Sequence, residues 1–403
     1  MAVGLNPPEL LHPVKGIRLA ALHSGIKADP TNKDLTLIEI AAQANIAAVF
    51  TTNKFCAAPV TVAQEHLRQN PEPRYLIINS GNANAGTGRN GYQHALMSCR
   101  YIASSAGVDE SQVLPFSTGV IAQELPVHCI ENSADQLIAR LDEGNWLPAA
   151  EGIMTTDTLP KAISLQVEIE GRLISITGIA KGSGMIKPDM ATMLSFIATD
   201  AEIDAVDLHP MLVGLVSTSF NAITVDGDTS TNDACVLIAT GKSGQKVSAE
   251  TPVFIDAITQ VFQGLAQSII RDGEGATKFV EVEVLNADSL ADAREVGYTV
   301  AQSPLVKTAL FASDPNWGRI LAAVGRAKIP SLDIERVDLY LGDTCLLKNG
   351  LPDPGYSEEQ GQAEMNKAEI CIRINLNSGG ATAKIWTSDL SYDYVKINAE
   401  YRS

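Results

Sequence analysis

A threonine that follows a glycine-broken loop is the first candidate for chemistry in this chain of 403 residues. The stretch AKGSGMIKPDMATMLSFIATDA, residues 180–201, places Lys181 before the loop and Thr192 at the start of an apolar run. A threonine hydroxyl is a weak nucleophile near neutral pH and needs a base beside it. Only one of the six histidines, His209, follows Thr192, and no H-x-x-x-H pair occurs. A histidine-based triad or metal site therefore has weak support.

Neither of two loops rich in glycine or acid matches a ligand-binding motif. A Walker loop places its lysine after the glycines, whereas Lys181 precedes them, and a dinucleotide fingerprint needs a small residue where Lys187 stands. The segment DGDTSTND, residues 226–233, has the carboxylate spacing of a calcium loop. It carries Thr231 where the sharp turn needs glycine, and Ile238 where a closing glutamate belongs. We interpret it either as a polar turn or as support for a neighbouring site.

Other polar segments could contribute single groups to a site. In PFSTGVIAQ, Thr118 and Gly119 follow a short apolar run, and a Thr-Gly turn can aim a hydroxyl and a backbone N–H at one point, as an oxyanion hole does. In DGEGATK, the flanking glycines leave Glu274 open to a cationic ligand. The alternatives are an ordinary turn and a solvated helix C-cap. The segments from Asn79, from Thr155 and at the C-terminal INAEYRS are equally ambiguous.

These segments lie between short β-patterned runs and longer helical runs, a pattern that predicts an α/β or α+β architecture. One hairpin, residues 163–180, is expected to turn at Glu170-Gly171 and to deliver the chain to Lys181. The run 191–199 fits a buried strand, although periodicity alone does not exclude a helix. The other expected strands are 35–40, 45–52, 74–80, 234–240, 278–285, 336–342, 369–377 and 382–390, and the expected helices are 91–107, 126–141, 205–223, 251–273 and 289–313.

Length and composition restrict the class of protein. A chain of 403 residues with 45% hydrophobic residues can bury a large core and is expected to form two or more domains. The pattern changes after about residue 286, which indicates a smaller closing domain. The formal net charge of −17, with no basic stripe, makes nucleic acid an unfavourable partner.

The same composition gives no sign of a membrane span or an exported protein. No apolar run is expected to reach the roughly 18 residues of a membrane span, and the N-terminus lacks signal-peptide order. The six cysteines lack any C-x-x-C pair, so neither a zinc site nor a disulfide framework is indicated. We therefore expect a cytoplasmic location.

Taken together, these segments resemble the ornithine acetyltransferase family, self-cleaving bifunctional enzymes of arginine biosynthesis. The resemblance covers nearly the whole chain. The matching segments, in the order of the family, are FTTNKFCAAPV, NSGNANAGTG, STGVI, IMTTDT, AKGSGMIKPDMATMLSFIATDA, DGDTSTND, DGEGATK, DPNWGRI and INAEYRS.

The resemblance implies self-cleavage between Ala191 and Thr192, which makes an α chain of residues 1–191 and a β chain of residues 192–403. Thr192 becomes the nucleophile, and its freed α-amine, with a reference pKa of about 7.7–8.0, can serve as the base that no histidine supplies. The resemblance makes Thr118 and Gly119 the oxyanion donors. It assigns substrate contacts to Thr155, Lys181, Thr192, Glu274, Asn398 and Ser403.

The activity implied is a ping-pong transfer of the acetyl group from N2-acetylornithine to glutamate through an acetyl-threonine enzyme, without a metal or cofactor. Some family members also accept acetyl-CoA as donor, and no residue of this sequence decides that point. The implied fold is a layered αββα sandwich over residues 1–285, similar to but distinct from N-terminal-nucleophile hydrolases, with a smaller α/β domain over residues 286–403 whose tail returns to the site. The implied assembly is an α2β2 heterotetramer.

Two rival functions remain open at this point. A self-processing aminopeptidase or amidase would use the same nucleophile and oxyanion hole with water as acceptor. A metabolite-binding protein without chemistry would hold amino acids between Lys181 and Glu274.

Overall fold

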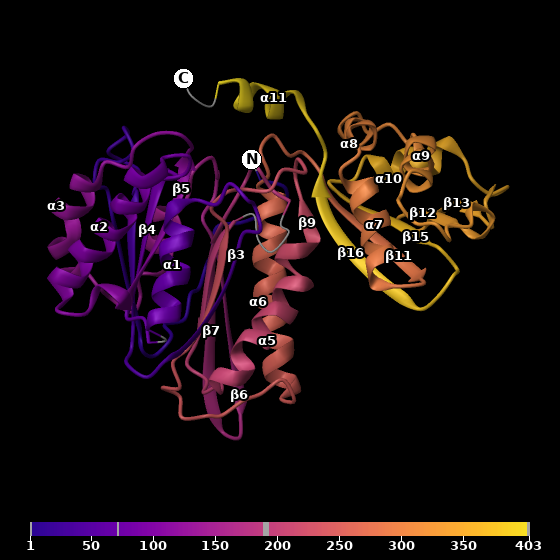
Figure 1. Cartoon of the computed structure of the whole chain (residues 1–403). Coiled ribbons are helices and arrows are strands. Elements are labelled where there is room, and N and C mark those ends of the chain that lie inside the picture. The colour runs from indigo at the N-terminus through magenta and orange to yellow at the C-terminus, as the bar shows by residue number, and fades with distance from the viewer. Residues whose placement is uncertain (1, 71, 188–192, 401–403) are drawn as a thin grey trace. The chain divides into compact units, whose positions relative to one another are not determined.

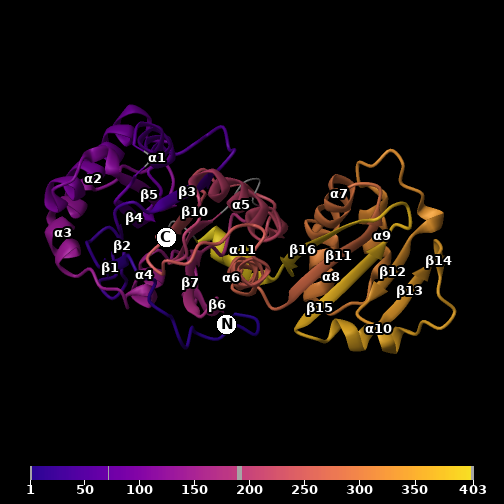
Figure 2. The ribbon, with the colours of Figure 1, turned by 90° about the horizontal axis from the view of Figure 1, so that it is seen from below.

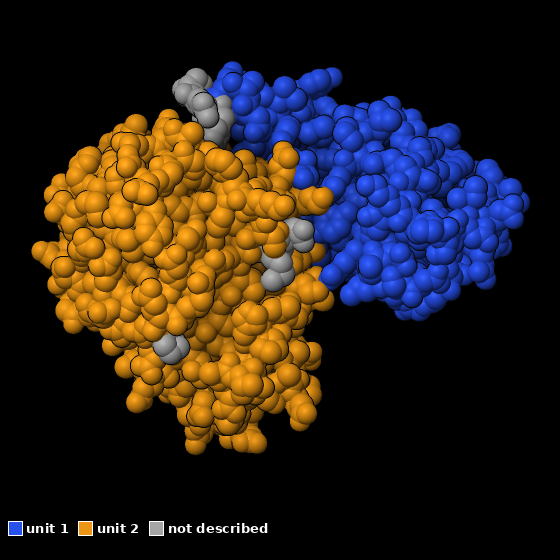
Figure 3. Space-filling model, viewed as in Figure 1, with its two compact units in different colours: residues 1–6, 222–227, 270–403 blue, residues 7–221, 228–269 orange. Residues whose placement is uncertain are grey.

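The computed structural model describes residues 2–70, 72–187 and 193–400, and these form two compact units (Figure 3). The sandwich unit comprises residues 7–221 and 228–269, and the C-terminal unit comprises residues 1–6, 222–227 and 270–403. The expected division into domains 1–285 and 286–403 is a different partition, and it stays a prediction.

Two sheets build the sandwich unit. The first has the strand order β1-β2-β4-β5 and the second the order β3-β10-β8-β7-β6. The strands of the first sheet are β1 (Ile17–Leu22), β2 (Leu35–Ile40), β4 (Tyr75–Asn82) and β5 (Val113–Val120). Those of the second are β3 (Asn45–Phe50), β6 (Lys161–Ile169), β7 (Arg172–Lys181), β8 (Leu194–Thr199) and β10 (Ala234–Ala239).

Apolar side chains from the facing sides of the two sheets form one core. Strand residues point alternately to opposite faces, so Leu114 and Phe116 of β5 enter this core together with Leu194 and Phe196 of β8. The rings of Phe116 and Phe196 meet edge to face with their centroids 5.1 Å apart. A second core lies on the outer face of the first sheet. The sheets therefore pack face to face as two layers.

Helices cover the outer faces of both sheets (Figures 1 and 2). Against the outer face of the first sheet lie α1 (Ala58–Gln69), α2 (Gly88–Ala106) and α3 (Val127–Ala139). Against the second lie α5 (Ala205–Ser217) and α6 (Pro252–Arg271). Helix α4 (Trp146–Gly152) contacts strands of both sheets, and its buried apolar side chains belong to the core between them. The order helix, sheet, sheet, helix confirms the expected αββα sandwich.

The predicted hairpin is confirmed and leads to Lys181. Strands β6 and β7 pair along their whole length, and the turn residues Glu170 and Gly171 both have positive φ, 51° and 76°, as a tight two-residue hairpin requires. The run after the loop forms strand β8, because β7 pairs with it on one side and β10 on the other. The ambiguity between helix and strand is thus resolved by pairing partners far away in the sequence.

The C-terminal unit has a seven-stranded sheet of order β14-β13-β12-β15-β11-β16-β9. Its strands are β9 (Ile223–Thr224), β11 (Phe279–Ala287), β12 (Asp338–Leu341), β13 (Thr344–Lys348), β14 (Leu351–Pro352), β15 (Glu369–Asn375) and β16 (Ala381–Ser388). Its helices are α7 (Leu290–Ala301), α8 (Pro304–Phe311), α9 (Trp317–Gly325), α10 (Glu358–Met365) and α11 (Tyr392–Ala399). Short 3-10 turns occur at Glu110–Gln112, Phe220–Ala222 and Ile334–Arg336.

The expectation that no apolar segment reaches membrane-spanning length is wrong for α6. This helix of 20 residues is long and apolar enough, but 56% of its most apolar window is buried. The ring of Phe262 contacts the ring of Phe220. Leu265 packs against Gly178 of β7, where an added Cβ would lie 2.9 Å from Cδ1 of Leu265. These contacts are those of a core helix, which passes the same test of length and composition.

We predict that Phe196→Ala destabilises the sandwich unit by about 3–5 kcal/mol, because it opens a cavity between the sheets and removes the ring contact with Phe116. The free energy of unfolding from urea titration measures this. Leu173→Ala on β7 is the control, since Leu173 is 52% exposed and its loss should cost less than about 0.5 kcal/mol. Equal losses in the two variants would contradict the prediction.

Candidate functional site

The Thr118-Gly119 turn lies at the end of β5, where β5 runs parallel to β4. Gly119 pairs with Gly81 and has a φ of 133°. A Cβ at Gly119 would lie 2.3 Å from the carbonyl carbon of Gly81 and 2.5 Å from the nitrogen of Asn82. Only glycine fits there, because both the backbone conformation and the close approach of β4 exclude a side chain.

Lys181 is the last residue of β7, and its side chain reaches across to the first sheet. Its Nζ donates to Oγ1 of Thr118 at 3.1 Å, and both residues are buried. On the other side of β7, Lys181 pairs with Leu194 of β8. The structure thus brings together the predicted oxyanion turn, the predicted substrate contact Lys181 and the start of β8.

A buried carboxylate, Asp157, binds the segments that contain Thr155 and Lys181. It accepts hydrogen bonds from the backbone N–H of Thr155 at 2.9 Å and of Gly182 at 2.8 Å. It also forms an ion pair with Lys161 at 2.6 Å, in which both side chains are fully buried. Burial alone would raise the pKa of Asp157, but the charges of Lys161 and Lys181 and the hydrogen bonds outweigh burial and hold it well below its ordinary value.

Asn232 ties the DGDTSTND segment to the ends of β4 and β5. Its Nδ2 donates to the carbonyl of Ser117 at 2.9 Å and to that of Ala83 at 2.6 Å. Its Oδ1 accepts from the hydroxyl of Thr231 at 2.6 Å. Because Ser117 directly precedes Thr118, this part of the segment supports the oxyanion turn rather than forming an isolated polar turn.

A second group of predicted residues lies together in the C-terminal unit. Nδ2 of Asn398, on α11, donates to Oε2 of Glu274 at 2.8 Å, and Glu274 is buried in a turn between two glycines. Gly275 has a φ of 68°, and a Cβ there would lie 2.5 Å from the nitrogen of Tyr394 on α11. The close packing of this turn against α11 fixes the carboxylate beside the amide.

Three predicted site residues, Ala191, Thr192 and Ser403, lie outside the described part of the chain. The other predicted residues fall into two sets, each described within its own unit. Thr118, Gly119, Thr155 and Lys181 belong to the sandwich unit, and Glu274 and Asn398 belong to the C-terminal unit.

Sequence reasoning missed Asp157, Lys161 and the contacts of Asn232. The signal for the first two was present in TTDTLPK, where an acid and a lysine stand four residues apart. That spacing is usually associated with an exposed pair on a helix. Here the pair is buried beside the start of β6, so spacing alone could not indicate its role.

Comparison with known proteins identifies relatives over the whole chain. The ArgJ family model matches residues 18–403. The arginine biosynthesis bifunctional protein ArgJ of Pseudomonas fluorescens (strain Pf0-1) is 52% identical, with 100% of each chain covered.

Solved structures are similar to parts of the chain. The crystal structure of arginine biosynthesis bifunctional protein argJ from Bacillus halodurans is 43% identical, with a TM-score of 0.50, over 52% of this chain and 100% of that chain. The crystal structure of ornithine acetyltransferase complexed with ornithine from Mycobacterium tuberculosis is 30% identical, with a TM-score of 0.38, over 44% of this chain and 94% of that chain.

We predict that Asp157→Asn lowers the free energy of unfolding by about 3–5 kcal/mol at pH 7, because Lys161 is left buried without its counter-charge. The depressed pKa makes this loss depend on pH. In the wild type the contribution of Asp157 is fully present above the unfolded-state pKa of about 3.9 and is lost as the pH falls toward the lower folded-state pKa. The difference between the two proteins should therefore shrink as the pH falls below about 4.

Urea titrations between pH 7 and pH 3 measure this difference. Asp204→Asn is the control, because its ion pair with Lys246 has a similar distance, 2.7 Å, but exposed side chains. It should cost at most about 1 kcal/mol. A loss of unfolding free energy for Asp157→Asn no larger than that of the control would show that the buried pair stabilises the protein no more than an exposed pair does.

Proposed function

We propose, from the premise that this chain belongs to the ArgJ family of arginine biosynthesis proteins, that it transfers the acetyl group of N2-acetylornithine to glutamate through an acetylated Thr192. The prediction of the family from its sequence motifs is confirmed, and the chain is an acyltransferase. The residue roles and the steps below are our proposal.

In the first half-reaction the hydroxyl oxygen of Thr192 attacks the acetyl carbonyl, and the α-amine of the same residue takes the hydroxyl proton. Thr118 and Gly119 donate hydrogen bonds to the oxyanion of the tetrahedral intermediate. The carbon–nitrogen bond then breaks, and ornithine leaves with the proton. In the second half-reaction the amine of glutamate attacks the acetyl-threonine ester, which releases N-acetylglutamate and restores the hydroxyl.

One observation carries this proposal: Lys181 pairs with Leu194 of β8 and also donates to Thr118 at 3.1 Å. Leu194 is two residues after the proposed nucleophile, and its pairing partner Lys181 contacts the proposed oxyanion donor Thr118. A buried lysine at that point supplies a compact cation for the α-carboxylate of either amino acid.

The remaining substrate contacts are proposed from residue chemistry. The Glu274 carboxylate can accept hydrogen bonds from the side-chain ammonium of ornithine, and Thr155, Asn398 and Ser403 can bond polar groups of the substrates. We further propose cleavage between Ala191 and Thr192, an α2β2 heterotetramer and a cytoplasmic location. Use of acetyl-CoA as a second donor belongs to the same proposal, since relatives are bifunctional by name.

The products formed from N2-acetylornithine test the function. With glutamate present, purified protein should form ornithine and N-acetylglutamate in equal amounts, and mass spectrometry should detect both. Free acetate formed equally with and without glutamate would instead indicate an amidase, in which water accepts the acetyl group. No turnover would leave only a metabolite-binding protein and would refute the proposal.

Substitutions at Thr192 test the nucleophile. Thr192→Ala should give an uncleaved and inactive chain, because the hydroxyl both cuts the chain and carries the acetyl group. Thr192→Ser should cleave into fragments 1–191 and 192–403 and turn over more slowly, since loss of the methyl group loosens the side-chain rotamer. Intact mass, N-terminal sequencing and trapping with labelled donor measure these effects. A label on Thr118 or on a cysteine, or full activity of an uncut chain, would disprove this mechanism.

A further inference from the structure

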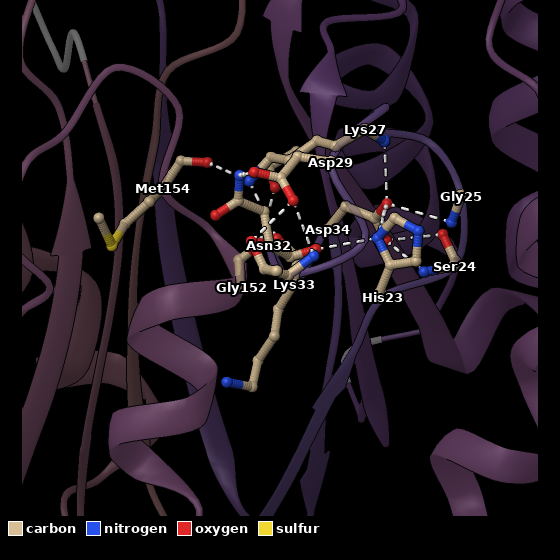
Figure 4. Close-up of polar contacts among 12 residues, drawn as sticks. His23, Ser24, Gly25, Lys27, Asp29, Asn32, Lys33, Asp34, Gly152 and Met154 are labelled. Carbon is tan, nitrogen blue, oxygen red and sulfur yellow. Dashed lines mark hydrogen bonds and ion pairs between the residues drawn. The ribbon is translucent and has the colours of Figure 1, made fainter.

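The loop between β1 and β2, residues 23–34, is held by one buried carboxylate (Figure 4). Asp34 is fully buried and accepts hydrogen bonds from the backbone N–H and the hydroxyl of Ser24, at 2.6 and 2.8 Å. It also accepts from the backbone N–H of Gly25 at 3.2 Å and of Lys27 at 2.9 Å. So many donors on one carboxylate fix the backbone of this loop and set the direction in which Lys27 leaves it.

The ammonium of Lys27 connects this loop to the segment that carries Thr155. Its Nζ donates to the carbonyl of Met154 at 2.8 Å and to that of Lys33 at 2.9 Å (Figure 4). Met154 directly precedes Thr155, a proposed substrate contact. The bond to the Met154 carbonyl therefore fixes the peptide group from which Thr155 starts.

The aliphatic part of the same side chain lies against the support of the oxyanion turn. A Cβ added at Gly81 would lie 3.0 Å from Cγ of Lys27. Gly81 in turn pairs with Gly119 and leaves no room for a side chain there. Next to Gly81, the Ser80 hydroxyl donates to the carbonyl of Gly152 at 2.7 Å. Lys27 thus contacts both Gly81, at the end of β4 beside Gly119, and Met154, which precedes Thr155.

Charged residues of the candidate site affect the pKa of Lys27. Burial lowers the pKa of Lys27, and the neighbouring charge of Lys181 lowers it further, while Asp34 and Asp157 raise it. Lys27 is therefore close enough to the proposed carboxylate contact and to its buried support to feel their charges.

We propose that Lys27 is a positioning residue of the acetyl transfer. It fixes the position of the Gly119 turn relative to the segment that carries Thr155. This inference rests on the proposed function. Hydrogen-bond donors to a developing oxyanion act only when held in place, and a misplacement of about 1 Å can lower a rate by roughly a hundredfold. Loss of the Lys27 bonds should therefore reduce kcat more than it changes KM, because the oxyanion forms only in the transition state.

Lys33 of the same loop offers a matched control. Its Nζ pairs with the carboxylate of Glu151 at 2.5 Å, but the two side chains are 34% and 39% exposed. A pair of this kind contributes little to stability. Lys33→Met therefore makes the same chemical change on the same loop without touching Met154 or Gly81.

The test compares Lys27→Met and Lys33→Met with the wild type. Methionine keeps most of the stem that lies on Gly81 and removes the ammonium. We expect Lys27→Met to lower kcat for N-acetylglutamate formation by about ten- to a hundredfold, with a smaller change in KM for N2-acetylornithine. Lys33→Met should stay within roughly twofold of the wild type in both constants. Intact mass and the thermal midpoint are measured for each protein, so that cleavage and folding are known.

A folded, cleaved Lys27→Met protein with wild-type kcat would overturn the inference, as would a lowered thermal midpoint without any change in kcat. If that variant does not fold, Lys27→Gln is measured instead, since it keeps donors but loses the charge and the reach to Met154. Wild-type kcat there would overturn the inference equally. If the wild type itself makes no N-acetylglutamate, the proposed function fails first and this inference fails with it.

Discussion

Three segments of the sandwich unit depend on the buried carboxylate of Asp157, which binds the N–H groups of Thr155 and Gly182 and the ammonium of Lys161. Each donor comes from a different part of the chain: the turn after α4, the residue that follows β7, and the start of β6. A buried carboxylate is costly unless its acceptor positions are filled, so the arrangement persists only while all three donors are present. The positions of Thr155 and of the chain after Lys181 are therefore not independent of each other.

The period of the strands explains why Lys181 meets Thr118. Phe116 and Ile179 both face the core between the sheets. Residues two positions further along a strand point to the same face, which places Thr118 and Lys181 on that side as well. The apolar core between the sheets thus ends in a polar pair, and the two groups bond at 3.1 Å. No special turn is needed to aim Lys181, because the pairing of β7 within its sheet already does so.

Much of the sandwich could be predicted from the sequence because its elements are strongly patterned. The hairpin around Glu170-Gly171 follows from alternation and a two-residue turn, and Thr118 and Lys181 stand out through the residues next to them. By contrast, strand β1 and helix α1 were not predicted, since α1 begins without a side-chain N-cap and its apolar face is short. The roles of Asp157 and Lys27 could not be read either. Asp157 acts partly through the backbone N–H of Gly182, 25 positions away, and Lys27 partly through the carbonyl of Met154, 127 positions away. A sequence pattern does not record such distant partners.

The charged residues around the turn carry a cost that the rest of the unit must offset. Lys161, Lys181 and Asp157 are all at least nine-tenths buried, and their charges sum to one excess positive charge. An excess of positive charge in a poorly solvated place disfavours the empty site and favours an anionic group entering it. Lys27 lies near the same groups, but the buried carboxylate of Asp34 beside it offsets its charge. In the proposed function, the α-carboxylate of a substrate beside Lys181 would relieve this imbalance on binding.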